Sequence, residues 1–418
     1  MSDHSWSVQP VPELRTLTTM RVGGAPTELL QPATTAELIA TTRAVWDSGV
    51  DWLLLGGGSN TIASDDGFDG TVIRILTHGI ERVPVTSDDD ATSALADEAT
   101  EGVAAAPGFA ADGSAVPETV RLRVQAGESW DDLVSVAVRN GWSGIEALAG
   151  IPGSVGAAPV QNIGAYGQEL SSRLVAIDFL EHPSGVVRRV PASELELGYR
   201  TSALKHGMTG VVLSIELDLI NSVEPLGAPL SQPILYSQLA DSLGVELGSR
   251  VSLAELRRTV LALRASKGMV LDPDDVDSVS AGSFFTNPIV TENFARRLPA
   301  DAPRWPTIPP EPDIVTPLDS AERVGNALRD GVGTVGGDEP FTVKLSAAWL
   351  IERAGIRRGY ALPGSRAAIS GKHTLAITNR GGASAQEIVQ LATFVQWRVQ
   401  SDFGVILQPE PVLVGLEL

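Results

Sequence analysis

The hydrophobic pattern of the first part of the chain predicts a small α/β unit. Apolar side chains recur every three or four residues over Thr34–Trp46, which is typical of a helix with one buried face, and Thr34 or Thr35 can cap its start. A short apolar strand is predicted over Asp51–Leu55, followed by the loop GGGSN and a second strand over Gly70–Leu76. The order helix, strand, glycine loop, strand favours one compact unit.

The middle of the chain continues with strands and one helix. The pattern predicts a serine-capped helix over Ser129–Asn140 and strands over Val120–Ala126, Leu174–Leu180, Gly185–Val190 and Gly210–Leu219. Residues Val85–Glu118 differ, because they carry eight acidic and no basic side chains and have little hydrophobic periodicity. We interpret them as an acidic, flexible surface insertion.

The composition shifts near residue 222, and the region after it is richer in helical patterns. Helices are predicted over Leu253–Ala265, Ala347–Ala354 and Ser384–Asp402. The segment Pro299–Pro317 is dense in proline, so we expect a loop outside the core. The shift supports a boundary between a cofactor region and a second domain.

Composition indicates a globular protein of two or three domains. Of the 418 residues, 43% are hydrophobic and 20% charged, and no apolar run approaches the roughly 18–20 residues that span a bilayer. The N-terminus MSDHSWSVQP lacks the basic and apolar regions of a secretion signal. There is no cysteine, which excludes disulfides, thiolate metal sites and cysteine nucleophiles. We therefore expect a cytoplasmic protein.

The net charge of −20 bears on possible partners. It argues against nucleic acid or an anionic membrane, because both require a basic surface. A dedicated transition-metal site is not expected either, because the histidines show no ligand spacing; they are His4, His78, His182, His206 and His373.

Two glycine-rich loops point to a bound phosphate. Gly144–Glu169 (GIEALAGIPGSVGAAPVQNIGAYGQE) holds six glycines, and no Lys or Arg occurs between Asn140 and Arg173. Main-chain N–H groups would therefore hold an anion here. GGGSN at Gly56–Asn60 follows a strand but matches neither the P-loop nor the Rossmann pattern. Together, the two loops could clasp a diphosphate from two sides.

Three polar residues are candidates for chemistry, and each also has a structural interpretation. Ser283 in AGSFFTNP is either a turn residue or a hydroxyl that hands a proton to a carbanion; without a G-x-S-x-G motif, a hydrolytic nucleophile is disfavoured. Arg200 in ELGYRTSALK is either a surface arginine or a group that captures a carboxylate. Glu410 in ILQPEPVL is either a strand-edge residue or a carboxyl whose apolar surroundings raise its pKa.

Seven motifs in order resemble the UDP-N-acetylenolpyruvoylglucosamine reductase (MurB) family over nearly the whole chain: LLGGGSN, LAGIPGSVGAAPVQNIGAYGQE, GYRTSALK, RASKG, AGSFFTNP, VKLSAAWLIE and LQPEP. The resemblance implies an α+β fold of the MurB/vanillyl-alcohol-oxidase FAD-binding type. It divides the chain into FAD-binding subdomains at 10–77 and 78–221 (with insertion 85–118), a substrate-binding domain at 222–404 (with a proline-rich insertion at about 292–340), and a C-terminal segment, 405–418, that returns to the active site.

The resemblance also implies the reaction. Non-covalent FAD would accept hydride from NADPH and pass it from flavin N5 to UDP-N-acetylglucosamine enolpyruvate, giving UDP-N-acetylmuramate for peptidoglycan, and hence for cell shape and division. Arg200 would pair with the enolpyruvyl carboxylate, Glu410 would polarise it while partly protonated, and Ser283 would protonate the α-carbon on the face opposite the flavin. The protein is expected to be a monomer whose partner is this small-molecule substrate.

Further residues carry over by their motifs. The implied substrate contacts are Tyr236, on a loop that closes over the diphosphate, Lys267 and Asn287, with His373 at a position of open role. The implied cofactor contacts are Gly56, Gly57, Gly58, Ser59, Asn60, Ile151, Pro152, Gly153, Ser154, Gly156, Gln161, Ile163, Gly164 and Tyr166.

Two other functions are weighed against this one. Another FAD-dependent oxidoreductase of the same fold, such as a sugar or lactone oxidase, predicts rapid reoxidation by oxygen and often a covalent flavin. A non-catalytic nucleotide-binding protein predicts loss of the catalytic residues. Arg200, Ser283 and Glu410 are all present, which argues against both alternatives.

Overall fold

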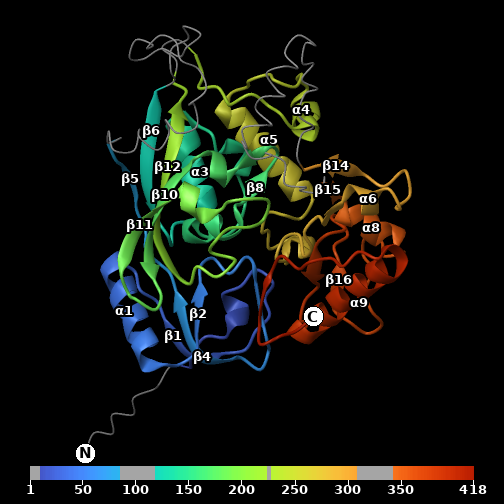
Figure 1. Cartoon of the computed structure of the whole chain (residues 1–418), viewed down its shortest axis with the longest axis horizontal. Coiled ribbons are helices and arrows are strands. Elements are labelled where there is room, and N and C mark those ends of the chain that lie inside the picture. Colours follow the sequence, from blue (N-terminus) through green and yellow to red (C-terminus); the bar gives the residue numbers. More distant parts are fainter. Residues whose placement is uncertain (1–9, 85–117, 224–226, 308–341) are drawn as a thin grey trace, which may run out of the picture.

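A computed structural model describes residues 10–84, 118–223, 227–307 and 342–418, so nearly all of the predicted acidic insertion 85–118 lies outside the described residues. The N-terminal part is a three-stranded parallel sheet with α1 packed on it (Figure 1). Its strands run in the order β1 (Pro26–Leu30), β4 (Phe68–Arg74) and β2 (Trp52–Leu55).

Helix α1 (Thr35–Ser48) begins where its cap predicts. The Thr34 hydroxyl accepts a hydrogen bond from the Glu37 N–H, and the Glu37 carboxylate accepts one from the Thr34 N–H, which completes a capping box. Gly49 ends the helix in the left-handed conformation, with a φ of 71°. The buried face of α1 packs against Ile73 of β4 and against the ends of two strands of the next sheet.

The second sheet is antiparallel and forms the larger core. Its strands run β11 (Val187–Pro191), β10 (Leu174–Glu181), β12 (Gly210–Asn221), β6 (Thr119–Gln125) and β5 (Ile80–Arg82), and β7 (Trp142–Ser143) pairs with β12. Three helices cover it: α3 (Trp130–Arg139), capped by Ser129, α4 (Ser237–Leu243) and α5 (Leu253–Ser266). Helices α4 and α5 thus share the core of this sheet although they follow residue 222; the domain boundaries stay a prediction.

The C-terminal part is a separate core of short strands and two longer helices (Figure 1). Its α9 begins directly after Ser384, the predicted first residue of this helix, which caps it, and ends before Gly404. The elements are β13 (Ile289–Thr291), α6 (Glu292–Ala295), β14 (Arg304–Pro306), β15 (Thr342–Leu345), α8 (Ala347–Arg353), β16 (Ala367–Ile369), β17 (Ile377–Asn379) and α9 (Ala385–Phe403).

The prediction of a loop outside the core over Pro299–Pro317 was wrong for the part that the structure describes. Strand β14 pairs with β15, and Ala302 is only 5% exposed within the C-terminal core. Proline is compatible with this arrangement because β14 lies at the edge of its sheet, where a missing N–H costs no ladder bond. Residues 308–317 of that segment lie outside the described residues.

Two short pairings position the loops that matter for the site. The C-terminal strand β18 (Val412–Val414) pairs in parallel with β3 (Thr61–Ala63), directly after GGGSN. Strands β8 (Gly164–Ala165) and β9 (Gln168–Glu169) form a small hairpin at the end of the longer glycine-rich loop. Short 3₁₀ turns complete the chain at Leu14–Thr16, Glu146–Leu148, Val155–Gln161, Leu170–Ser172, Ala192–Leu195 and Val276–Ser278.

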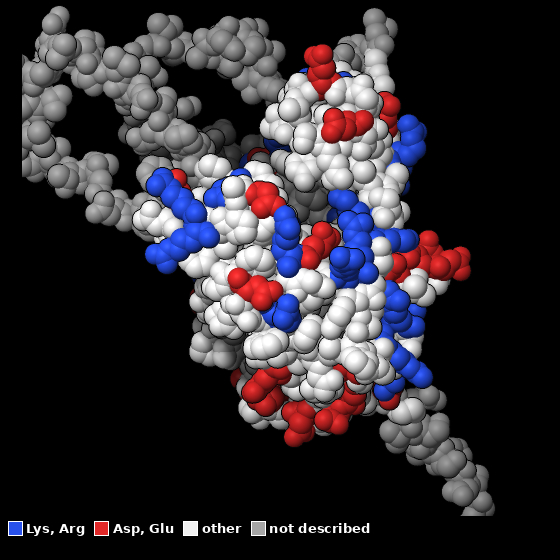
Figure 2. All heavy atoms as spheres, turned by 90° about the vertical axis from the view of Figure 1, so that its right-hand side faces the viewer, with Lys and Arg blue, Asp and Glu red and all other residues white. Residues whose placement is uncertain are grey.

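The surface charge is unevenly distributed. On the face shown in Figure 2, Lys and Arg side chains gather over the middle and Asp and Glu side chains at the lower end. Although the net charge is −20, the basic side chains on this face can attract an anionic ligand locally. Within the described ranges, no helix is long and apolar enough to cross a membrane, and no three metal-ligating side chains gather.

Candidate active site

The two glycine-rich loops meet and form one wall of a cleft. The Ser59 hydroxyl donates to the Pro152 carbonyl oxygen at 3.1 Å. A Cβ on Gly57 would lie only 2.7 Å from the Gly153 Cα, and one on Gly56 would collide with the Ser154 hydroxyl. The loops are in contact because these positions lack side chains. The sequence-based expectation that these loops clasp a diphosphate from two sides stays a prediction.

The chemistry of this wall fits the diphosphate of FAD. In the described part of the chain, the N–H groups of Gly57, Gly58, Ser59 and Ser154 donate to no other group. Adjacent, unpaired main-chain donors are what binds phosphate without a cationic side chain.

Most of the predicted cofactor residues line this cleft, and several residues not singled out from the sequence line it too. The predicted ones are Gly56, Gly57, Gly58, Ser59, Asn60, Ile151, Pro152, Gly153, Ser154, Gly156, Gln161 and Ile163. The additional ones include Trp130, Phe179, Leu204, Lys205, Met208 and Val412, and Glu410 lies at the same cleft. The apolar members suit a flat aromatic ring system.

We expect Gly57→Ala to weaken FAD binding. Its Cβ would push the two loops apart, and such overpacking costs about 1–3 kcal/mol, which is roughly 5- to 150-fold in affinity. Gly49→Ala is the control, because it strains a positive φ but its Cβ would meet no atom of the described residues within 4 Å. The dissociation constant of FAD, measured by titration of its fluorescence, should change only for Gly57→Ala. Equal values for the two variants would contradict a cradle formed by these loops.

A second cleft adjoins the first. Two of its tyrosines, Tyr166 and Tyr236, make an edge-to-face contact with ring centroids 5.8 Å apart. Gly164 and Tyr166, predicted as cofactor contacts, line this second cleft instead of the first, so their cofactor role stays a prediction. The cleft is lined by Gly164, Ala165, Tyr166, Gly167, Arg173, Tyr199, Arg200, Gln232, Tyr236, Asn287 and Lys344, among others.

Arg200 and Glu410 meet where the two clefts join. Arg200 lines the second cleft, Glu410 lines the first, and the Arg200 Nε lies 3.5 Å from the Glu410 Oε1. Arg200 adopts a φ of 55°, unusual for a residue with a side chain, and its guanidinium donates to the Gly164 carbonyl oxygen at 2.8 Å. Strain of this kind persists where the surrounding structure holds a side chain in place.

Burial raises the pKa of the Glu410 carboxyl, and Arg200 and Lys205 oppose that rise only in part. The prediction of a raised pKa from the apolar neighbours of Glu410 is confirmed. A carboxyl in this condition can carry a proton and donate a hydrogen bond to an anionic ligand.

Backbone pairing brings the segment of Ser283 next to the segment of Glu410. The Glu410 N–H donates to the Phe284 carbonyl oxygen at 2.8 Å, and Phe285 forms a bridge with Pro409. Ser283 directly precedes Phe284, whose carbonyl oxygen accepts from the Glu410 N–H. The Ser283 hydroxyl lies 3.3 Å from the His373 Nε2. The three predicted catalytic residues thus come from three segments that the fold brings to one region.

The other predicted substrate residues surround this region. The Lys267 ammonium lies 5.6 Å from the centre of the Tyr166 ring and donates to the Gln238 amide oxygen at 2.9 Å. Burial and Arg264 lower the Lys267 pKa. The Asn287 side-chain oxygen accepts from the Ala347 N–H at the start of α8, at 3.0 Å.

His373 is neutral at physiological pH. Burial first, and then Lys267, Arg358 and Arg264, lower its pKa from 6.5 to about 4. A lowered pKa of a base means that the folded protein resists its protonation, so this contribution to stability is complete above pH 6.5 and is lost as the pH falls toward about 4.

We therefore expect the wild-type free energy of unfolding to fall by about 2–3 kcal/mol more than that of His373→Gln between pH 7 and pH 4.5. Urea unfolding of both proteins at the two pH values measures this difference. An unchanged difference between the proteins would contradict a buried, neutral histidine, whereas shifts common to both proteins come from other groups.

Several residues of the site were not predicted from the sequence. Arg264 is 7% exposed and follows Leu256 and Val260 at four-residue spacing on the buried face of α5. A charged residue on an apolar helix face was the available signal. Tyr199 and Lys344 approach one another in the second cleft, with the ammonium 4.8 Å from the ring centre, and no local pattern marks that contact.

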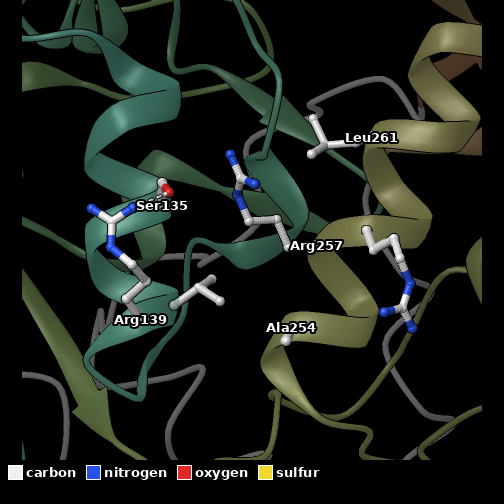
Figure 3. A pocket seen from close by; sticks show the side chains of 7 residues that line it. Ser135, Arg139, Ala254, Arg257 and Leu261 are labelled. Atoms are coloured by element: carbon white, nitrogen blue, oxygen red, sulfur yellow. Dashed lines mark hydrogen bonds between the residues drawn. The ribbon is translucent and has the colours of Figure 1, made fainter.

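A separate hollow between α3 and α5 lies outside both clefts (Figure 3). Arg257 pairs with Asp131 at 2.7 Å, and Arg139 donates to the Ser135 hydroxyl at 2.8 Å. These guanidinium groups already have partners within the protein, so we assign no ligand to the hollow. It is lined by Ser135, Val138, Arg139, Ala254, Arg257, Arg258 and Leu261.

Two family models match this chain. One describes the C-terminal domain of UDP-N-acetylenolpyruvoylglucosamine reductase and matches residues 273–414; the other describes an FAD binding domain and matches residues 26–190. The chain is 60% identical to a UDP-N-acetylenolpyruvoylglucosamine reductase from Leifsonia xyli subsp. xyli (strain CTCB07), over 97% of this chain and 99% of the relative. It is 41% identical to a protein of the same name from Nocardia farcinica (strain IFM 10152), over 99% and 91%.

A solved structure supports the fold. The UDP-N-acetylenolpyruvylglucosamine reductase (MurB) from Thermus caldophilus matches with a TM-score of 0.53 and 23% identity, covering 96% of this chain and 97% of its own. The predicted α+β, FAD-binding fold is confirmed by this likeness and by the family model for FAD binding.

Proposed function

Because the chain belongs to the UDP-N-acetylenolpyruvoylglucosamine reductase family, we propose that Arg200, Glu410 and Ser283 carry its reaction. The protein is an FAD-dependent oxidoreductase that uses NADPH to reduce UDP-N-acetylglucosamine enolpyruvate to UDP-N-acetylmuramate in peptidoglycan precursor synthesis.

The first cleft would hold FAD non-covalently. Gly57, Gly58, Ser59 and Ser154 would present main-chain N–H groups to its diphosphate, and the apolar residues of the cleft would enclose its ring system. Bound FAD supplies the chemistry of accepting a hydride from NADPH and delivering it to the enolpyruvyl group.

Arg200 binds the enolpyruvyl carboxylate, and Glu410 steadies it. The planar guanidinium can make two parallel hydrogen bonds to a carboxylate, and it stabilises the negative charge that spreads into that group as the double bond is reduced. Glu410 donates a hydrogen bond while it is protonated, which its raised pKa favours. The contact between the two side chains keeps both at the junction of the clefts.

Ser283 donates the proton that completes the product. Its O–H bond breaks as a C–H bond forms at the carbon next to the carboxylate. Tyr236, Asn287 and Tyr166 line the second cleft, and the Lys267 ammonium lies beside the Tyr166 ring. These hydroxyls, the amide and the ammonium suit a nucleotide diphosphate. We propose this cleft as the site of the UDP-sugar, with Tyr166 serving the substrate more than the cofactor.

We further propose that the protein works in the cytoplasm as a monomer, with small molecules as its partners. The absence of cysteine suits a reducing compartment, and the acidic net charge suits neither nucleic acid nor an anionic membrane. Gel filtration with light scattering would test the oligomeric state.

The observation that carries the proposed roles is the Arg200–Glu410 contact at the join of the two clefts. The test of the function is the rate of NADPH oxidation by the purified yellow protein, with and without UDP-N-acetylglucosamine enolpyruvate. The substrate should accelerate oxidation strongly and appear as UDP-N-acetylmuramate. An equal rate without the substrate would instead indicate an oxidase.

A further inference from the structure

His373 lies against Ser283 because two backbone segments hold them together. The Phe284 N–H donates to the Leu375 carbonyl oxygen at 2.7 Å, and Ser280 forms a bridge with Thr378. These contacts lie on both sides of Ser283 and follow His373 in the chain, and the Ser283 Oγ lies 3.3 Å from the His373 Nε2. Chain pairing therefore brings the segments that carry the two side chains together.

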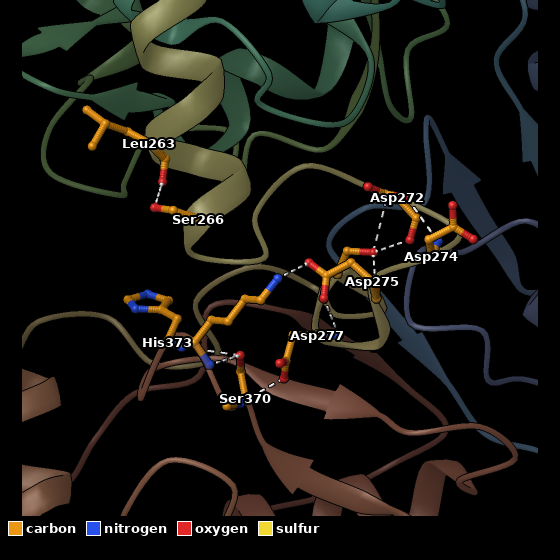
Figure 4. A network of polar contacts seen from close by, with 11 residues as sticks. Leu263, Ser266, Asp272, Asp274, Asp275, Asp277, Ser370 and His373 are labelled. Atoms are coloured by element: carbon orange, nitrogen blue, oxygen red, sulfur yellow. Dashed lines mark hydrogen bonds and ion pairs between the residues drawn. The ribbon is translucent and has the colours of Figure 1, made fainter. Parts of the chain in front are cut away.

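An aspartate-rich loop supports the turn that carries His373 (Figure 4). The Asp277 carboxylate accepts from the Gly371 N–H at 2.7 Å, and the Lys372 ammonium pairs with Asp275 at 2.8 Å. The Ser370 hydroxyl accepts from the His373 N–H at 3.2 Å. In Figure 4 the imidazole points away from the aspartates, so the loop fixes the turn while the ring stays available to Ser283.

The charges around His373 favour a negative charge on its neighbour. Lys267, Arg358 and Arg264 act on the imidazole, and burial adds to their effect, so that it stays neutral until about pH 4. A neutral imidazole carries one N–H and cannot be the strong acid of the reaction. The same cations would stabilise an alkoxide on Ser283, which a serine that gives up its proton must become.

We propose that His373 is a positioning residue for Ser283: its Nε2–H donates to the Ser283 Oγ and stabilises the alkoxide left after proton transfer to the α-carbon. This proposal rests on the proposed function. The Ser283 O–H bond breaks, the C–H bond forms, and the negative charge moves from the substrate to the Oγ. Solvent water then returns a proton to the Oγ and releases hydroxide to the buffer.

A pair of substitutions at His373 distinguishes this positioning role from simple substrate binding. His373→Leu removes the donor at similar volume, whereas His373→Gln places an amide N–H near the position of Nε2. We expect His373→Leu to lower kcat by roughly 10- to 100-fold with little change in KM, and His373→Gln to recover most of the loss. Reduction by NADPH alone should match the wild type in both, which also shows that both are folded.

Three kinetic outcomes would overturn this role. Equal losses in the two variants indicate a structural role, and a raised KM at constant kcat indicates substrate binding. The third comes from a double substitution: in a Ser283→Ala background, His373→Leu should cost nothing further, and an undiminished additional loss would show that His373 acts elsewhere.

A measurement independent of turnover completes the test. Nitrogen-15 NMR of the histidine-labelled holoprotein, with the His373 signal assigned by its loss in His373→Gln, should show the proton on Nε2 at pH 7. A proton on Nδ1 would contradict the proposal. Failure of the proposed function is distinguishable from failure of the His373 proposal, because in the first case the wild-type protein itself would show no substrate-driven turnover.

Discussion

Arg200→Lys should slow the substrate-dependent half of the reaction by roughly 100- to 1,000-fold and leave reduction by NADPH unchanged. Lysine keeps the positive charge but loses the planar pair of donors that a carboxylate accepts, and it loses the donation to the Gly164 carbonyl oxygen. Stopped-flow absorbance in two stages, first with NADPH and then with the enolpyruvyl substrate, separates the two halves.

Arg257→Lys is the matched control. Arg257 also pairs with a carboxylate and its side chain is 22% exposed, as is that of Arg200, but it lies at the hollow between α3 and α5. Both halves of the reaction should remain normal in this variant. An Arg200→Lys protein that slows in both halves, or in neither, would contradict a role at the substrate carboxylate.

Ser283→Ala should slow the same second half by roughly 10²–10⁴-fold, which is the usual contribution of a positioned proton donor. NADPH should still bleach the flavin at the wild-type rate, because no proton from Ser283 is used in that half. Mixing the pre-reduced variant with substrate under nitrogen, and following the return of the yellow colour, measures the effect.

Ser266→Ala serves as the control for this substitution. The Ser266 hydroxyl is exposed at the end of α5 and, among the residues that the structure describes, donates only to the Leu263 carbonyl oxygen, at 2.8 Å. Both halves should be unaffected by its loss. Equal slowing of the two halves in Ser283→Ala would mean that the serine shapes the site and does not donate the proton.

Local signals in the sequence predicted the helices whose first turns are capped by a side chain. Thr34, Ser129, Ser252 and Ser384 each accept a hydrogen bond from the first turn of a helix, and a hydrophobic face follows each of them. The two glycine loops were also readable, since glycine at those positions reports a close approach of backbone.

Long-range pairing could not be predicted from the chain alone. The Arg200–Glu410 contact depends on β18 pairing with β3, and nothing in the spacing of the two residues indicates it. Strand β14 was missed because proline density outweighed its edge position in the interpretation. Arg264 was not predicted as a buried residue because the helix was identified from its apolar positions, and the charged residue at the next four-residue step was not examined for burial.

NADPH-derived electrons should leave this protein only onto the enolpyruvyl group held beside Arg200, Glu410 and Ser283. An anaerobic single turnover tests it most directly: one equivalent of NADPH reduces the holoprotein, and UDP-N-acetylglucosamine enolpyruvate is then added. We predict full return of the oxidised flavin spectrum with one equivalent of UDP-N-acetylmuramate formed. A flavin that stays reduced until oxygen is admitted would contradict the account.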